Sequence, residues 1–185
     1  MRNLIYSMTV SLDGFIAGRD GEIDWSAPDE ELHRFHNQRM REVAVQLCGR
    51  RLYEVMTYWE TADENPSAPD HVLEFARLWK DTPKIVFSNT LEKVEGNARL
   101  VRGSVADEVV KLKEQPGNDL AVGGAGLASS LIELNLIDDY RLFVSPVVLG
   151  GGTPCFPALD ERIELELVET RTFASRVVYV RYRRL

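Results

Sequence analysis

Residues 119–134 read DLAVGGAGLASSLIEL, which predicts an apolar strand, a tight turn and the start of a helix. The turn holds Gly123, Gly124, Ala125 and Gly126. Glycine lets the backbone adopt positive φ and approach a ligand, and a helix that begins there points unpaired N–H groups at an anion. The stretch therefore predicts a pyrophosphate site, although turn geometry alone is an equally ordinary reason for such glycines.

The glycine turn does not have the fingerprint of an ordinary Rossmann domain. That fingerprint is G-x-G-x-x-G after the first strand, with an acidic residue ~20 positions later. Here Ser129 stands where the third glycine is required, and the turn comes late in the chain. A different nucleotide-binding α/β fold is therefore expected.

Two further segments are candidates for contact with dinucleotide phosphates. GRRLYE at residues 49–54 follows an apolar run and predicts a short helix, with Arg50 or Arg51 at its N-terminus. A guanidinium there can bind the 2'-phosphate of NADPH through two hydrogen bonds, and the alternative is a pair of solvated arginines. Ser88, in VFSN at the end of a predicted strand, is a candidate phosphate donor or a simple turn former.

Apolar alternation and capping signals predict strands interleaved with helices. One helix is expected over residues 28–42, with Ser26 and Asp29 as its capping residues, and two more begin at Ser104 and after Gly126. Because no helix separates the last two strands, the pattern predicts a layered α/β sheet with an antiparallel C-terminal edge hairpin. The strands are expected at residues 3–10, 44–48, 83–88, 98–102, 119–123, 139–149, 163–170 and 175–184.

Size and charge narrow the functional class. The chain has 185 residues, 44% of them hydrophobic, and a formal net charge of −7, which predicts one globular domain over residues 1–185. No apolar run suits a signal peptide or membrane helix, and Cys48 and Cys155 are far apart in the chain. The chain is therefore expected in the cytoplasm, with neither a membrane nor nucleic acid as a partner.

The motifs, taken in order, resemble the dihydrofolate reductase-like superfamily. They are SMTVSLDGFIAGRDGEIDW at residues 7–25, GRRLYE, VFSN, the glycine turn and SPVVLGGGTPCF at residues 145–156. The S-x-D-G start and the G-G-G-x-P-x-F stretch are most similar to the reductase domain of riboflavin biosynthesis, the RibD C-terminal domain family. Leu52, where that family usually has threonine, and Cys155, where it usually has leucine, depart from the pattern.

The resemblance implies a three-layer α/β/α fold with a mixed, mostly parallel central sheet. It also implies a homodimer and an NADPH-dependent reductase of a small heterocycle, either a pterin or a 5-amino-6-ribosylaminouracil-like pyrimidine. A non-catalytic nucleotide-binding or sensor protein on the same fold is the alternative. A hydrolase is disfavoured, because Ser129 and Ser130 lack a G-x-S-x-G elbow.

The same resemblance assigns roles to individual residues. Trp25 would lie beside the substrate. The cofactor residues fall into three groups. The nicotinamide would contact Thr9, Ile16 and Ala17; the adenosine phosphate would contact Gly49, Arg50 and Ser88; the pyrophosphate would contact Gly123, Gly124, Ala125 and Gly126.

Two carboxylates compete as the catalytic acid. Glu31 matches the position of the acid of dihydrofolate reductase if Phe35 is aligned with the same helix, and Asp13 lies in SLDGF after the first strand. Helix capping and a D-G turn explain the two residues equally well. A proton donor in a partly desolvated cleft should have a raised pKa.

The remaining candidates have simpler explanations. His33 and His36 are three residues apart, but no third metal ligand follows at a recognisable spacing, so no metal site is predicted and both are expected at the surface. Tyr53, Tyr58 and Trp59 could stack a substrate ring, although core packing is the more frequent role of such residues.

Overall fold

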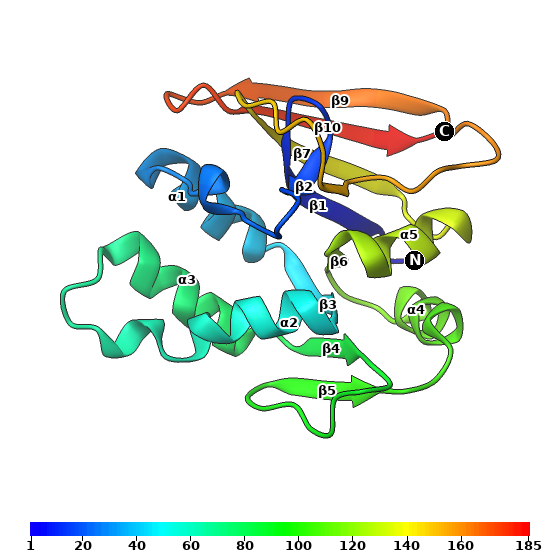
Figure 1. The fold of residues 1–185 in the computed structure, drawn as a ribbon. Helices are drawn as coiled ribbons and strands as arrows, with labels where there is room; N and C mark the ends of the chain where they lie inside the picture. The colour runs from blue at the N-terminus through cyan, green and yellow to red at the C-terminus, as the bar shows by residue number, and fades with distance from the viewer.

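A computed structural model describes residues 1–185 and contains one large sheet in the order β5-β4-β3-β6-β1-β7-β10-β9 (Figure 1). The first six strands in this order are parallel, and β10 and β9 complete the sheet as an antiparallel pair. The strands are β1 (Leu4–Ser11), β3 (Val43–Gly49), β4 (Lys84–Phe87), β5 (Ala98–Val101), β6 (Asp119–Gly123), β7 (Asp139–Ser145), β9 (Leu165–Thr172) and β10 (Val178–Arg184).

Helices cover both faces of the sheet. The main core lies on the face covered by α4 (Val105–Glu114) and α5 (Ala125–Glu133), where Leu4 and Tyr6 of β1 are fully buried. The opposite face carries the helices α1 (Glu30–Met40), α2 (Arg50–Met56) and α3 (Asp70–Asp81), together with the short helices η1 (Asp24–Ser26), η2 (Thr57–Glu60) and η3 (Ala62–Glu64). Because side chains alternate along a strand, Ile5 and Ser7 face α1 instead.

This architecture confirms the expected mixed α/β sheet with its antiparallel edge pair. The expected cap of the first helix was wrong in one respect. The Asp29 carboxylate accepts from the Leu32 amide at 2.9 Å, whereas Ser26 bonds the Ile23 carbonyl at 2.6 Å and lies before the helix. The strand expected over 139–149 ends at Ser145, because the next residue is a proline.

A second, two-stranded sheet joins distant segments above the end of β1. It pairs β2 (Phe15–Ala17) with β8 (Thr153–Pro154). Gly152 has φ +136°, and a Cβ there would lie 2.0 Å from the Ala17 carbonyl oxygen, so only glycine permits this approach. No helix of the protein has both the length and the apolar character needed to cross a membrane.

Candidate active site

The parallel strands end side by side, and two of them lead directly into helices. Cys48 of β3 pairs with Gly123 of β6, and Gly49 pairs with Phe87 of β4. The predicted phosphate-binding residues Gly49, Ser88 and Gly123 therefore lie side by side at the carboxyl ends of the parallel strands, an edge of the sheet that runs across the strands. This is the edge where open α/β sheets bind ligands.

The helices that begin at this edge have no side-chain cap. Helix α5 starts after Gly124 (φ +84°) and helix α2 after Gly49, and neither receives a capping side chain. In contrast, Asp29 caps α1 and Ser104 caps α4. The first-turn N–H groups of α5 are therefore available to an anion, and the positive end of the helix dipole favours one.

The expected adenosine-phosphate residues come together beside α2. The Arg50 guanidinium donates to Thr90 Oγ1 at 3.0 Å and to Glu54 Oε1 at 2.7 Å. Ser88 Oγ accepts from the amides of Thr90 and Leu91 at 3.2 and 3.1 Å, so this hydroxyl already organises a turn. Arg50 and Ser88 thus share Thr90 as a neighbour.

The expected nicotinamide residues lie at the carboxyl end of β1. Thr9 pairs with Phe143 of β7, and it lies two positions beyond Ser7 on the same face of the sheet. Ile16 and Ala17 belong to β2, and Ile16 packs against the main core. Trp25, in η1, bonds the Glu22 carbonyl at 3.2 Å and is half-buried.

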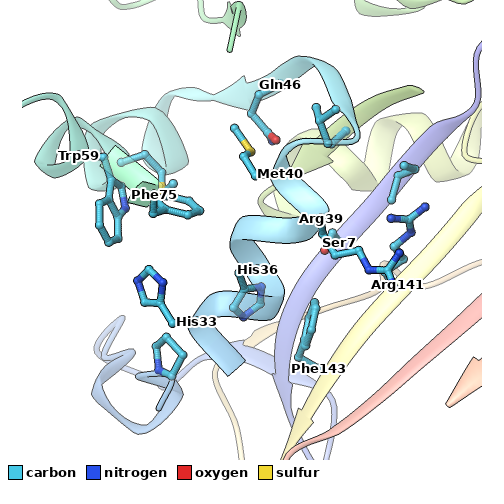
Figure 2. Close-up of a pocket in the computed structure, with 15 residues that line it drawn as sticks. Ser7, His33, His36, Arg39, Met40, Gln46, Trp59, Phe75, Arg141 and Phe143 are labelled. Atoms are coloured by element: carbon cyan, nitrogen blue, oxygen red, sulfur yellow. The ribbon is translucent and has the colours of Figure 1, made fainter. Parts of the chain in front are cut away.

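A cavity of about 280 Å³ lies between α1 and the sheet (Figure 2). Aromatic side chains of η2, α3 and β7 form much of its wall, and its polar groups are imidazoles, guanidiniums, one hydroxyl and one amide. The cavity is lined by Ile5, Ser7, Pro28, His33, His36, Arg39, Met40, Val43, Gln46, Met56, Trp59, Phe75, Ala121, Arg141 and Phe143.

The sheet register gives this cavity two chemically different ends. The His36 ring lies on Phe143, with 4.3 Å between ring centroids, and Phe143 pairs with Thr9. Arg141 pairs with Ser7, two residues further from the carboxyl end of β1. An imidazole therefore lies at the expected nicotinamide end, and a guanidinium lies at the far end.

The histidines were wrongly expected at the surface. His33 is buried against Trp59, Phe75 and His71, and its Nδ1 lies 3.2 Å from Asn37 Oδ1. Burial, reinforced by His71, lowers the pKa of His33. Burial also lowers the pKa of His36 to about 4, so its imidazole is neutral at pH 7.

Neither carboxylate proposed as the acid lines the cavity. Glu31 binds Arg171 at 2.8 Å and the Ala174 amide at 3.0 Å, and these bonds, the one from the amide first, lower its pKa. Asp13 accepts from Ser11 at 2.7 Å and from the amides of Leu149 and Gly150 at 3.1 and 2.7 Å. These bonds, the one from Ser11 first, lower the pKa of Asp13 to about 2. The raised pKa expected of a proton donor is therefore contradicted at both positions.

Arg39, Arg141 and Gln46 were missed as lining residues. For α1 a signal was present, because His33, His36 and Met40 repeat at the spacing of one helical face. Arg141 and Gln46, which lie on strands, had no such signal, since a polar or charged residue in a predicted strand is normally assigned to the solvent side.

Protein stability should fall as the pH is lowered from 7 to 5. The unfolded chain protonates His36 near its ordinary value of 6.5, whereas the native protein resists protonation down to about 4. The stabilisation is thus complete above pH 6.5 and decreases below it, by on the order of 1–2 kcal/mol at pH 5. Urea unfolding at both pH values measures this loss of stability, and the loss should be smaller in His36→Phe. If His36→Phe lost as much stability as the wild type, burial of His36 would not be its cause.

Comparison with known proteins gives a consistent family assignment. The family model described as the RibD C-terminal domain matches residues 2–179. A protein from Bacillus subtilis named uncharacterized protein YyaP is 36% identical over 182 residues, which cover 98% of this chain and 94% of that protein.

Solved structures share the fold. A putative riboflavin biosynthesis protein from Shewanella superposes with a TM-score of 0.76 at 24% identity, covering 100% of this chain and 99% of the other. Dihydrofolate reductase from Enterococcus faecalis, solved as a complex with NADP(H), gives a TM-score of 0.66 at 18% identity, covering 98% and 96% of the two chains. At these identities the similarity establishes the architecture alone.

Proposed function

Because this chain belongs to the RibD C-terminal domain family, we propose that it is an NADPH-dependent reductase of a small heterocyclic substrate. The observation that carries the proposal is one juxtaposition. The uncapped start of α5 lies at the same end of the parallel strands as Thr9, and Phe143, which pairs with Thr9, lines the cavity under α1. An extended dinucleotide along this edge would bring its reactive ring to the cavity mouth.

The residues present fit NADPH. The Gly124 amide already donates to Met8 Sδ at 3.2 Å, and the first turn of α5 offers the free N–H groups for the pyrophosphate. Arg50 offers a guanidinium for the adenosine phosphate. When bound, the cofactor supplies a hydride. The protein must then orient the substrate and stabilise charge that develops on it, and His36 is placed to do this as a neutral hydrogen-bond donor.

The cavity favours one of the two expected substrate types. A 2-aminopterin presents a donor-rich edge that requires a carboxylate or a similar acceptor, whereas no carboxylate lines this cavity. A uracil-like ring presents carbonyl oxygens, which the imidazole and guanidinium donors match. We therefore favour a pyrimidine of the aminouracil type over a pterin.

An acceptor screen tests the proposal. Purified protein with NADPH is mixed with aminouracil, pterin, quinone and nitroaromatic acceptors, and absorbance at the reduced-nicotinamide band is followed. Acceptor-dependent oxidation is expected. Tight NADPH binding without oxidation by any acceptor would favour the second candidate, a non-catalytic nucleotide sensor, and the absence of NADPH binding would exclude both.

Arg50→Ala should weaken NADPH binding by ~1.5–3 kcal/mol, the contribution of a hydrogen bond to a charged group. NADH lacks the 2'-phosphate, so its affinity should change little. Fluorescence titration with both cofactors measures the difference, and Arg51→Ala serves as the neighbouring control. An equal loss for both cofactors would show that Arg50 does not read the 2'-phosphate.

We also propose a homodimer. The segment 145–156 leaves apolar side chains exposed, Val148 by 65% and Phe156 by 37%, and Leu12 nearby in the β1–β2 turn is 67% exposed. Multi-angle light scattering should give twice the monomer mass of 21.0 kDa. Val148→Asp should shift the mass toward the monomer, and a wild-type protein that is monomeric at micromolar concentration would remove the proposal.

A further inference from the structure

The far end of the cavity contains a buried guanidinium with incomplete pairing. The Arg141 side chain is only 6% exposed, and it lines the cavity. Its Nε donates to Asp139 at 2.9 Å, and its Nη1 lies 3.4 Å from Glu42. No bond to the protein occupies Nη2. Figure 2 shows Arg141 beside Ser7 and Arg39 at one side of α1.

The carboxylates around this group are shared with other arginines. Asp139 also accepts from Arg181 at 2.7 Å, and Glu42 also pairs with Arg39 at 3.1 Å. The Nε of Arg39 is buried without a hydrogen-bond partner.

The carboxylates that pair with Arg39 are more exposed to solvent than its guanidinium. The side chains of Glu42 and Glu169, which pair with Arg39, are 43% and 35% exposed, whereas Arg39 is 22% exposed. Water screens charges at exposed positions more strongly than buried ones. Asp139 is the one deeply buried carboxylate of the network, and it serves two guanidiniums. The three guanidiniums and three carboxylates balance formally, but two of the carboxylates are partly exposed, so the less screened charge at this end of the cavity is positive.

We propose that the cavity selects a planar heterocycle that carries a carboxylate, with the carboxylate held by Arg141 and Arg39. The proposal rests on the proposed function in taking this cavity as the substrate site. A carboxylate would receive a hydrogen bond from Arg141 Nη2. Arg39 adds a second guanidinium charge to the same lining, and Ser7 offers a hydroxyl.

The dimensions set the size of this ligand. At about 280 Å³ the cavity is at the lower limit of ligand pockets, so it suits one or two rings with a short substituent. His36 and Phe143 lie at one end and Arg141 at the other, separated by two residues along β7 or about 7 Å. A ring against Phe143 thus places a directly attached carboxylate within reach of Arg141.

A matched ligand pair tests the selection. Orotate and 6-methyluracil have the same ring and differ in a carboxylate against a methyl group. Their dissociation constants are measured by quenching of tryptophan fluorescence, with Trp59 in the cavity wall as the reporter, in the full chain with and without NADPH. We expect orotate to bind at least ~10-fold more tightly, the effect of one charge-assisted hydrogen bond. Equal affinities would overturn the proposal.

Arg141→Met and Arg181→Met form the decisive pair of variants. Both remove a guanidinium from Asp139, but only Arg141 lines the cavity. The orotate preference should vanish in Arg141→Met and persist in Arg181→Met. If Arg141→Met does not fold, Arg39→Met, which removes a more exposed side chain, should reduce the preference. Equal losses in the Arg141 and Arg181 variants, or full preference in Arg39→Met and Arg141→Met, would overturn the assignment.

The tests distinguish failure of the carboxylate site from failure of the proposed reductase function. If NADPH is oxidised by an acceptor but orotate shows no preference, the reductase remains and the carboxylate site is excluded. If orotate is preferred through Arg141 but NADPH does not bind, the anion site remains and the reductase is excluded.

Discussion

Gly124→Val is expected to abolish measurable NADPH binding while leaving the protein folded. Gly124 has φ +84° and ψ 124°, a conformation that a β-branched residue adopts only with strain on the order of 1–3 kcal/mol. Its Cβ would also lie 3.4 Å from Leu52 Cβ. The first turn of α5 must then reorient, so its N–H groups no longer converge on a phosphate, and affinity should fall at least ~100-fold.

A second glycine supplies the control for backbone strain. Gly21 has a similar φ of +83°, but it lies in an exposed turn where an added Cβ would meet no atom within 4 Å. Gly21→Val should therefore lose comparable stability and keep NADPH binding. Circular dichroism monitors the fold and fluorescence titration the affinity; a folded Gly124→Val that binds NADPH normally would place the cofactor elsewhere.

His36→Phe is expected to lower turnover by ~10²–10³-fold, the usual effect of removing one preorganised donor at a site of developing charge. The phenyl ring can keep the packing on Phe143, and it removes the ring nitrogens that lie in the cavity. Affinity for NADPH should change little, because the glycines proposed to bind its pyrophosphate do not line the cavity. Steady-state kinetics with the best acceptor from the screen measure the loss.

Glu31→Gln is the matched control for this experiment. Its carboxylate is exposed to solvent and joins α1 to Arg171, so its loss should cost little stability and leave turnover near the wild-type value. If Glu31→Gln were folded but inactive while His36→Phe kept the wild-type turnover rate, the roles assigned to the two residues would be reversed.

The sequence predicted the sheet and the glycine turn after β6 well because both depend on local signals. The run before Gly123 is a strand over the expected residues, and Ser104 caps α4 by accepting from the Asp107 amide at 3.2 Å. Short-range patterns of this kind are set by backbone geometry within a few residues.

The cavity under α1 was not predictable in the same way, since it depends on how distant elements meet. Helix α3 was not anticipated, and it is this helix that covers His33 through Phe75. Arg141 becomes a cavity residue only because α1 crosses β7 and because Asp139, which also binds Arg181, holds its guanidinium there. The helix alignment through Phe35, which put Glu31 at the position of a catalytic acid, does not bring Glu31 into the cavity, because its carboxylate binds Arg171 and the Ala174 amide instead.

The position of β1 in the sheet has a consequence for how the chain folds. This N-terminal strand pairs with β6 and β7, with contacts that span 116 and 134 residues. Such non-local pairing slows folding, because the entropy of closing a long loop is lost before the contacts form. During synthesis β1 must wait, with both edges open, until most of the chain has left the ribosome. Aggregation during refolding should therefore depend more on β1 than on β9, which finds its partner in the adjacent hairpin.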